Sequence, residues 1–560
     1  MRIALVCCPS WSVDFPPYNI SLLKAILKQN GHEVKNFDFN IQTYQFLTKG
    51  DTDYWEGQNY FHWQGKVFNE GILPKINHLI DELVDSILEY KPDFIGFTIF
   101  DTSISCTIFV VEKIRKKDSS VKIIFGGPQC FNGGESMFLG LADYVVTGEG
   151  EISILEPLKY PKNRIIQPPA FTKINDLPTP DYEDYDLTKY RNADGISMEA
   201  SRGCIAKCAF CLETHFWTYR SKKAVNIIKE IKEYIKKYGA IMFRFNDSLV
   251  NGNIKEFYKL VNILSEEKLG IRWDGYLRIN GEMDLEFMQK IKDSGNGCVS
   301  YGIESGSQKV LNDMKKGITI DEAEQNLIDG DKVGLNNHIN WMVGFPSEDF
   351  IDAKYSLVFL FNNRKQIHAI SPGMTCGIGG ESDLQLHREK FDVLNETYWG
   401  GFVTKDLKNN AINRFIRLKI LHIWLDLLNI VNGQYHENIN RHYSINFFAD
   451  NYSRERIEYE ECFNFDYLSK ETFESTFYAE YMLFFWVIYK AFGAFQMSII
   501  FDKNRDIEEF GSHITQGYNA IAIFNINENG KWTFRLDHSL EHIKPFEESK
   551  LLQGYFNDEY

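Results

Sequence analysis

The 560-residue sequence predicts an α/β protein made of three parts. Through the first 155 residues, short apolar runs alternate with helical patterns, which is typical of βαβ units and a parallel sheet. Six more strand signals with helices between them follow, and they predict a partial (β/α)6 barrel. We expect a doubly wound domain at 1–160, a linker at 161–194, a barrel at 195–376 and an α+β domain at 377–560.

The first domain is predicted from its strands and from the loops that follow them. Its strands are expected at 2–8, 32–39, 94–98, 121–125 and 143–147, and its helices at 20–30 and 76–88. Gly126-Gly127-Pro128 follows the fourth strand, and Gly148-Glu149-Gly150 follows the fifth. Ligands of such sheets bind beyond the carboxyl ends of the strands, so these glycine loops mark a candidate site.

An aromatic insertion, Tyr54-Trp55 through Phe61-His62-Trp63, interrupts this pattern. Two interpretations are open: a loop that packs on a neighbouring domain, which we favour, or a wall of a substrate pocket.

The barrel strands are expected at 196–201, 240–246, 271–279, 297–303, 337–344 and 368–371. The helix at 222–238 should bury Val225, Ile228, Ile231 and Ile235 and expose its lysines. Reactive side chains are expected at the carboxyl ends of the strands. Cys376 follows the sixth strand, where a buried structural thiol is favoured over a catalytic one.

The C-terminal region is predicted to be α+β. Helices are expected at 412–431, ended by Gly433, and at 480–492. A hairpin is expected from 519–526 to 531–535 across Asn529-Gly530. Such a tail, folded over the barrel mouth, would select the substrate.

Composition limits the classes of function. The net charge of −16 argues against non-specific binding of nucleic acid, but does not exclude a basic patch for an acidic electron donor. The longest apolar run, 481–489, is far short of the roughly 18 to 20 residues that span a bilayer. The N-terminus lacks the features of a signal peptide. We therefore expect a cytoplasmic protein with reduced cysteines and no membrane insertion.

The most specific motif is Cys204, Cys208 and Cys211, in the pattern C-x3-C-x2-C. Three thiolates hold three corners of a 4Fe–4S cubane and leave the fourth iron open to another ligand. A zinc site would use four protein ligands, and no second pair of cysteines follows at a suitable spacing. Three structural cysteines in an ordinary core remain the alternative.

With Phe210 before the last cysteine, the motif resembles the signature of the radical S-adenosylmethionine (SAM) superfamily. Gly302-Ile303-Glu304-Ser305-Gly306-Ser307 and Gly344-Phe345-Pro346 also resemble this family. The resemblance implies a partial TIM barrel in which SAM chelates the open iron and is cleaved to a 5′-deoxyadenosyl radical. It implies that SAM is bound by Phe210, Asn246, Arg278, Glu304, Ser305, Gly344 and Phe345.

Some of these roles have alternatives. Arg278 would pair either with the SAM carboxylate or with Glu304. Asn246 and Asp247 would touch SAM or substrate, or else cap the following helix.

The order of loops in the first domain resembles the Rossmann-like cobalamin-binding domain that precedes many radical SAM barrels. The resemblance implies that cobalamin is bound by Thr102, Gly126, Gly127, Thr147, Gly148 and Glu149. The Asp-x-His-x-x-Gly motif of other cobalamin proteins is absent, since residues 36–40 contain no histidine. A domain of the same fold that binds no cobalamin is therefore the alternative interpretation.

Together these resemblances imply a cobalamin-dependent radical SAM C-methyltransferase. Its expected partners are a small-molecule or peptide substrate and a reductant such as flavodoxin or ferredoxin. No side chain is assigned as a catalytic acid or base, because the cofactors carry the chemistry. The alternatives are a radical cyclase, rearrangement or carbon–carbon coupling enzyme without methyl transfer, and a cofactor-binding sensor.

Overall fold

The computed structural model describes residues 1–48, 53–55, 57–131, 138–159, 164–167 and 173–396, then 402–406, scattered positions from 409 to 432, and the strands at 496–502, 519–526 and 532–538. The chain divides into two compact units. The first holds Met1–Gly203, Phe216–Gly275 and Asp293–Asn296, and the second holds Cys204–His215, Tyr276–Lys292 and Gly297–Tyr560.

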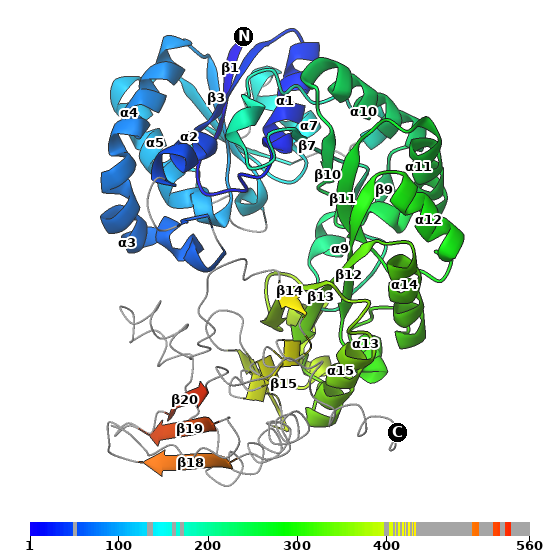
Figure 1. Ribbon diagram of the computed structural model, residues 1–560. Helices are drawn as coiled ribbons and strands as arrows, with labels where there is room; N and C mark the ends of the chain where they lie inside the picture. Colours follow the sequence, from blue (N-terminus) through cyan, green and yellow to red (C-terminus); the bar gives the residue numbers. More distant parts are fainter. Residues whose placement is uncertain are drawn as a thin grey trace. The chain divides into compact units, whose positions relative to one another are not determined.

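The N-terminal sheet has six parallel strands in the order β2-β1-β3-β4-β5-β6 (Figure 1). They are β1 Arg2–Cys7, β2 Glu33–Asp38, β3 Phe94–Thr98, β4 Lys122–Gly126, β5 Tyr144–Val146 and β6 Ile165–Ile166. The first five confirm the predicted strands within two residues at each end. The sixth has two residues, too few for a recognisable pattern.

Helices cover both faces of this sheet, as a doubly wound domain requires. They are α1 Tyr18–Gln29, α2 Phe39–Leu47, α4 Leu73–Glu89, α5 Ile104–Lys117, α7 Gly150–Ser153 and α8 Glu156–Lys159. Alternate residues of β1 enter different cores: Ala4 and Val6 pack with α4 and α5, whereas Ile3 and Leu5 pack with α1.

The aromatic insertion packs into the core of its own domain. It forms the 3-10 helix η1 Gly57–Trp63, and Trp55 and Trp63 join the core cluster of α4 and α5. Their ring centroids are 4.9 Å apart. Both interpretations from the sequence were therefore wrong for these tryptophans. The physical reason is that the two indole rings carry a large apolar surface, which is more stable in the domain core than exposed to water on a short loop.

The barrel sheet contains the six predicted strands in chain order, β7-β10-β11 in the first unit and β12-β13-β14 in the second, followed by β17 Val431–Asn432. The strands are β7 Gly195–Met198, β10 Met242–Phe245, β11 Arg272–Leu277, β12 Asn296–Glu304, β13 Asn336–Val343 and β14 Ala369–Thr375. The neighbouring strands β7, β10 and β11 pair parallel, as do β12, β13, β14 and β17, which confirms the predicted partial barrel.

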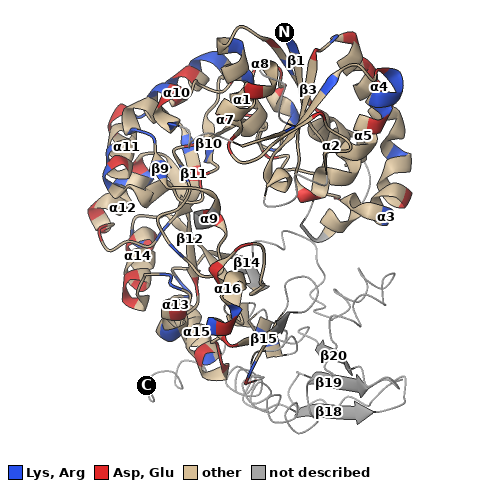
Figure 2. Ribbon diagram, turned by 180° about the vertical axis from the view of Figure 1, so that it is seen from behind, with Lys and Arg blue, Asp and Glu red and all other residues tan. Residues whose placement is uncertain are grey.

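Helices follow the barrel strands as predicted. The helices are α10 Ala224–Tyr238, α11 Ile254–Glu267, α12 Leu285–Asp293, α13 Gln308–Asp313, α14 Ile320–Lys332 and α15 Phe350–Asn362. Thr319 with Glu322, and Asp349 with Asp352, form capping boxes that begin α14 and α15. Along α10 and α11, Figure 2 shows basic and acidic positions interspersed.

One part of the α10 prediction was wrong. Val225 is 61% exposed, and the buried face instead holds Ala224, Ile227, Ile228, Ile231 and Tyr234. At 100° per residue, Val225 lies about a third of a turn away from the centre of that face.

In the C-terminal region, β19 Asn519–Ile526 pairs antiparallel with β20 Trp532–His538, which confirms the predicted hairpin. A parallel neighbour, β18 Gln496–Asp502, was not predicted. The helix expected at 480–492 lies outside the described residues. Of the helix expected at 412–431, the described positions from 413 to 425 are helical, whereas Val431 belongs to β17. Among the described helices, none combines the length and the apolar character needed to cross a membrane.

Candidate active site

The three motif cysteines lie on one loop whose two ends pair as a short antiparallel ribbon. The ribbon consists of β8 Ser201–Arg202 and β9 Arg220–Ser221, so residues 203–219 form the loop between them. Gly203 has a φ of +77°, and a Cβ there would lie 3.0 Å from the carbonyl oxygen of Trp217. A glycine is therefore required where the two ends of the loop pass each other.

The cysteine loop itself is anchored through its backbone in the second unit. Ala209 donates its N–H to the carbonyl of Met314 and accepts one from Leu384. Burial raises the pKa of the Cys204 and Cys211 thiols, while the charge of Arg278 acts in the opposite direction on Cys204. All three cysteines are free, and they supply the thiolate donors that an iron–sulfur cluster needs. Among the described residues, no three His, Cys, Asp or Glu side chains are already gathered around one point as a metal site.

Glu304, at the carboxyl end of β12, pairs with Lys316, whose ammonium also faces the aromatic residue of the cysteine loop. Its Oε1 is 3.2 Å from Nζ of Lys316, and the same ammonium lies 5.6 Å from the centre of the Phe210 ring. Glu304 has a φ of +78°, an unfavourable backbone conformation for a residue with a side chain. Such strain is concentrated at functional sites.

The ion pair of Glu304 is therefore made with Lys316, and Arg278 is anchored on backbone. Arg278 donates to the carbonyl oxygens of Lys316 and Gly317. Lys316 is a site residue whose role the sequence analysis missed. Its position in the run Leu311, Met314, Lys316, Gly317 gave no signal about which side chain it meets.

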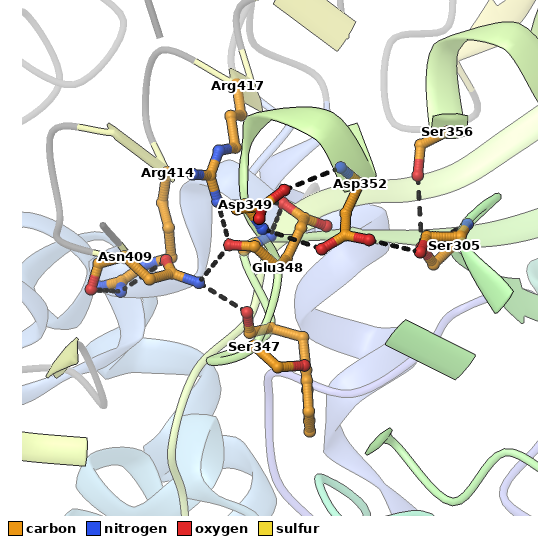
Figure 3. A network of polar contacts seen from close by, with 12 residues as sticks. Ser305, Ser347, Glu348, Asp349, Asp352, Ser356, Asn409, Arg414 and Arg417 are labelled. Atoms are coloured by element: carbon orange, nitrogen blue, oxygen red, sulfur yellow. Dashed lines mark hydrogen bonds and ion pairs between the residues drawn. The ribbon is translucent and has the colours of Figure 1, made fainter. Parts of the chain in front are cut away.

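Ser305 makes its side-chain contacts with Ser356 and Ser307. Its side chain is fully buried, and its hydroxyl is 3.2 Å from that of Ser356 on α15 (Figure 3). The hydroxyl also accepts the N–H of Ser307. Its side chain thus has partners within the fold.

The Gly344–Phe345 turn at the end of β13 is held by a buried polar network (Figure 3). The N–H of Gly344 donates to Oε1 of Glu348 at 2.8 Å, and Arg417 lies 3.3 Å from the same carboxylate. Asn409 donates to the carbonyl of Phe345 at 2.6 Å. A Cβ on Gly344 would lie 2.3 Å from Cγ of Arg414, so the chain passes too closely there for any side chain.

Phe345 and Cys376 belong to one core cluster with Ala209 of the cysteine loop. Burial raises the pKa of Cys376 to about 12. The thiol is therefore protonated at neutral pH, which fits the structural interpretation of this cysteine.

The two polar residues that follow β10 are placed differently. Asn246 is exposed, and its N–H donates to the carbonyl of Met198. Asp247 is buried, and its carboxylate accepts the N–H groups of Ala200 and Ser201. Asp247 thus ties two barrel strands together. The cap of α11 is Asn253 instead, so the capping interpretation of Asp247 was wrong.

The residues predicted to bind cobalamin lie together at the carboxyl ends of β3, β4 and β5. Gly127 has a φ of +102° and a Cβ there would be 2.8 Å from the backbone N of Ile99, while Gly148 has a φ of +70°. The missing side chain at Gly127 lets this turn pack against the backbone of Ile99, and the positive φ at both positions favours glycine. The hydroxyl of Thr102 donates to the carbonyl of Ser10 at 2.5 Å, and that of Thr147 to the carbonyl of Ile166 at 3.3 Å.

Glu149 differs from its neighbours because its carboxylate is buried in ion pairs. Its side chain is 2% exposed and contacts Arg202 and Arg220, the two arginines of the β8–β9 ribbon. No pattern in the sequence indicated this arrangement, although Arg202 stands in the run Ser-Arg-Gly-Cys.

Comparison with known proteins shows two domains. A model described as the radical SAM superfamily matches residues 198–360, and a model described as the B12 binding domain matches residues 66–157. An uncharacterized methyltransferase of Pyrococcus horikoshii is 26% identical over 305 residues, 50% of this chain and 66% of that protein. An anaerobic magnesium-protoporphyrin IX monomethyl ester cyclase of Rubrivivax gelatinosus is 23% identical over 298 residues, 48% of this chain and 54% of that protein.

The chain thus spans less than two thirds of the length of these relatives. Among solved structures, the cobalamin-dependent SAM radical enzyme OxsB with aqua-cobalamin bound superposes with a TM-score of 0.57 at 16% identity. The match covers 88% of this chain and 73% of OxsB, and it supports the fold. The cysteine loop and the barrel that follows it, with the domain that precedes them, show that the chain contains a radical SAM domain after a B12-binding domain.

Proposed function

We propose that the protein is a cobalamin-dependent methyltransferase that uses SAM to methylate an unactivated carbon of its substrate. The observation that carries the proposal is the presence in one chain of a cysteine loop of the radical SAM type and a B12-binding domain. When bound, the cluster supplies the electron that cleaves SAM to a 5′-deoxyadenosyl radical, and cobalamin carries the methyl group.

The chain's own residues would bind and orient these groups. Cys204, Cys208 and Cys211 would hold three irons as thiolates, which requires that each thiol lose its proton. Glu304 would accept a charge-assisted hydrogen bond from the SAM ammonium. The backbone of Gly344 and Phe345 would lie near the adenine, and the network of Glu348 holds that turn in place.

No protein acid or base is needed in this scheme. The protein must hold the reacting carbon near both reagents and exclude water. The proposed substrate is a small molecule or a peptide. The proposed electron donor is a flavodoxin- or ferredoxin-like reductant.

The test uses anaerobically purified, reconstituted protein with SAM and dithionite. We expect 5′-deoxyadenosine from reductive cleavage and S-adenosylhomocysteine from methyl transfer to reduced cobalamin. Cys204→Ala should abolish 5′-deoxyadenosine formation and leave uptake of hydroxocobalamin largely unchanged. Failure of the wild-type protein to give a reduced cubane signal by electron paramagnetic resonance would refute the proposal.

A second candidate is radical cyclisation without methyl transfer, favoured by the relative named as a cyclase. This candidate predicts 5′-deoxyadenosine without S-adenosylhomocysteine. A cofactor-binding sensor would give neither product.

A further inference from the structure

A buried group of five charged side chains closes the cysteine loop at its base. Arg202 and Arg220 are directly opposite each other in the β8–β9 ribbon, and every motif cysteine lies in the loop between them. Like charges in directly opposite positions of an antiparallel pair repel each other. The ribbon therefore needs anions to close.

Three carboxylates supply that compensation. Glu199 accepts two hydrogen bonds from Arg202, at 2.7 and 3.0 Å, and Glu151 lies 2.6 Å from the same guanidinium. Glu149 lies 3.2 Å from Nη1 of Arg202 and contacts Arg220 as well. Glu149 thus contacts both arginines, so it bridges the two arms of the ribbon.

All five side chains are at most 18% exposed, so water screens their charges weakly. Removing one partner of such a group leaves a buried charge without compensation, which is strongly unfavourable. These buried ion pairs therefore hold together the segments that carry the five residues.

The segments come from the two domains identified above. Glu149 follows Thr147 and Gly148 directly after β5, within the segment matched by the B12-binding model. Arg202 precedes Cys204 by two residues, within the segment matched by the radical SAM model. A shift of the loop after β5 would move both arginines with it.

We infer that Glu149 is a positioning residue that links cobalamin binding at the loop after β5 to the order of the cysteine loop. The inference rests on the proposed function for its two ligands. Coupling of this kind is reciprocal, so the cluster must change the affinity for cobalamin by the same factor as cobalamin changes that for the cluster.

The test measures this coupling in the full chain. Hydroxocobalamin affinity is determined by absorbance titration of cluster-loaded and of cluster-free protein, and the ratio of the two dissociation constants is compared among variants. We expect the wild-type constants to differ by about 5-fold or more, as for typical allosteric coupling. In Arg220→Gln, which opens the bridge and keeps the sequence of the loop after β5, the ratio should fall to near one.

Arg272→Gln is the matched control. Arg272 forms an exposed ion pair with Asp194 at 2.8 Å and should keep the wild-type ratio. Should Arg220→Gln fail to fold, Arg220→Lys keeps the charge, removes the two-pronged contact with Glu149 and should lower the ratio. Equal constants in the wild-type protein would overturn the inference, as would a ratio unchanged in both Arg220 variants.

Hydrogen exchange separates this inference from the proposed function. In protein free of both cofactors, peptides covering residues 200–222 should exchange about 10-fold faster in Glu149→Gln than in the wild type, and unchanged exchange would overturn the role of Glu149. If the wild type binds neither cluster nor cobalamin, the proposed function fails, yet this measurement still decides whether Glu149 holds the loop.

Discussion

The buried carboxylate of Glu348 offers the sharpest test of how the turn after β13 is held. Glu348→Gln keeps the size of the side chain and the oxygen that accepts the N–H of Gly344, but removes its charge. That charge faces Arg417 at 3.3 Å, and the two side chains are 3% and 1% exposed. The substitution therefore leaves a buried guanidinium without its carboxylate.

The size of the effect follows from this burial. Breaking a buried ion pair by removing one partner costs about 3 to 5 kcal/mol. Arg417 also donates to the backbone carbonyl of Glu348 at 2.9 Å, and that hydrogen bond survives the substitution. We therefore expect the lower end, about 3 kcal/mol, or a fall in unfolding midpoint of roughly 6 to 12 °C for a domain of this size.

Thermal unfolding of the cofactor-free protein, followed by circular dichroism, measures this directly. Glu267→Gln is the control, since its ion pair with Lys232 is exposed and should contribute less than about 0.5 kcal/mol. Calorimetric titration of SAM into the cluster-loaded variant should also show weaker binding, because the Gly344 turn loses its anchor. A midpoint equal to that of the control would show that the pair does not stabilise the turn.

Three more outcomes are expected. Burial raises the pKa of Asp247 to about 7 from 3.8, so the folded state holds a proton that the unfolded chain releases. The free energy of unfolding therefore falls by about 3 kcal/mol from pH 4 to pH 7. Asp247→Asn removes this loss, so its gain in unfolding midpoint over the wild type should be larger at pH 8 than at pH 5; a gain independent of pH contradicts the buried titration. Gly203→Ala should cost about 2 kcal/mol, because alanine disfavours the positive φ and its Cβ would press on Trp217, and iron content after reconstitution should fall below the wild-type value. Lys316→Met removes the cation beside Glu304. SAM should therefore raise the unfolding midpoint of the cluster-loaded variant more than it raises that of the wild type. An equal rise would argue against contact between Glu304 and SAM.

Local patterns in the sequence were sufficient for the elements and their order. Strands such as β3, and the turn glycines after β4 and β5, were predicted because apolar runs and glycines reflect neighbouring residues only. The cysteine spacing indicated the metal-binding loop for the same reason. The matches to both domain models agree with that assignment.

Partnerships across long stretches of chain could not be predicted in this way. Glu149 was assigned to cobalamin from its place in a glycine loop, yet its carboxylate meets Arg220, 71 residues away. Glu348 meets Arg417, 69 residues away, and Trp63 enters the core of its own domain. None of these contacts leaves a periodic signal.

The sequence by itself determined the class of chemistry, because a thiolate triad and a glycine-lined sheet edge are properties of short segments. Only the tertiary structure decided which charges face each other: Lys316 with Glu304, and Glu149 with both arginines of the ribbon. The physical reason is that a buried charge must be compensated within a few ångströms, and packing, not chain order, selects the group that lies there.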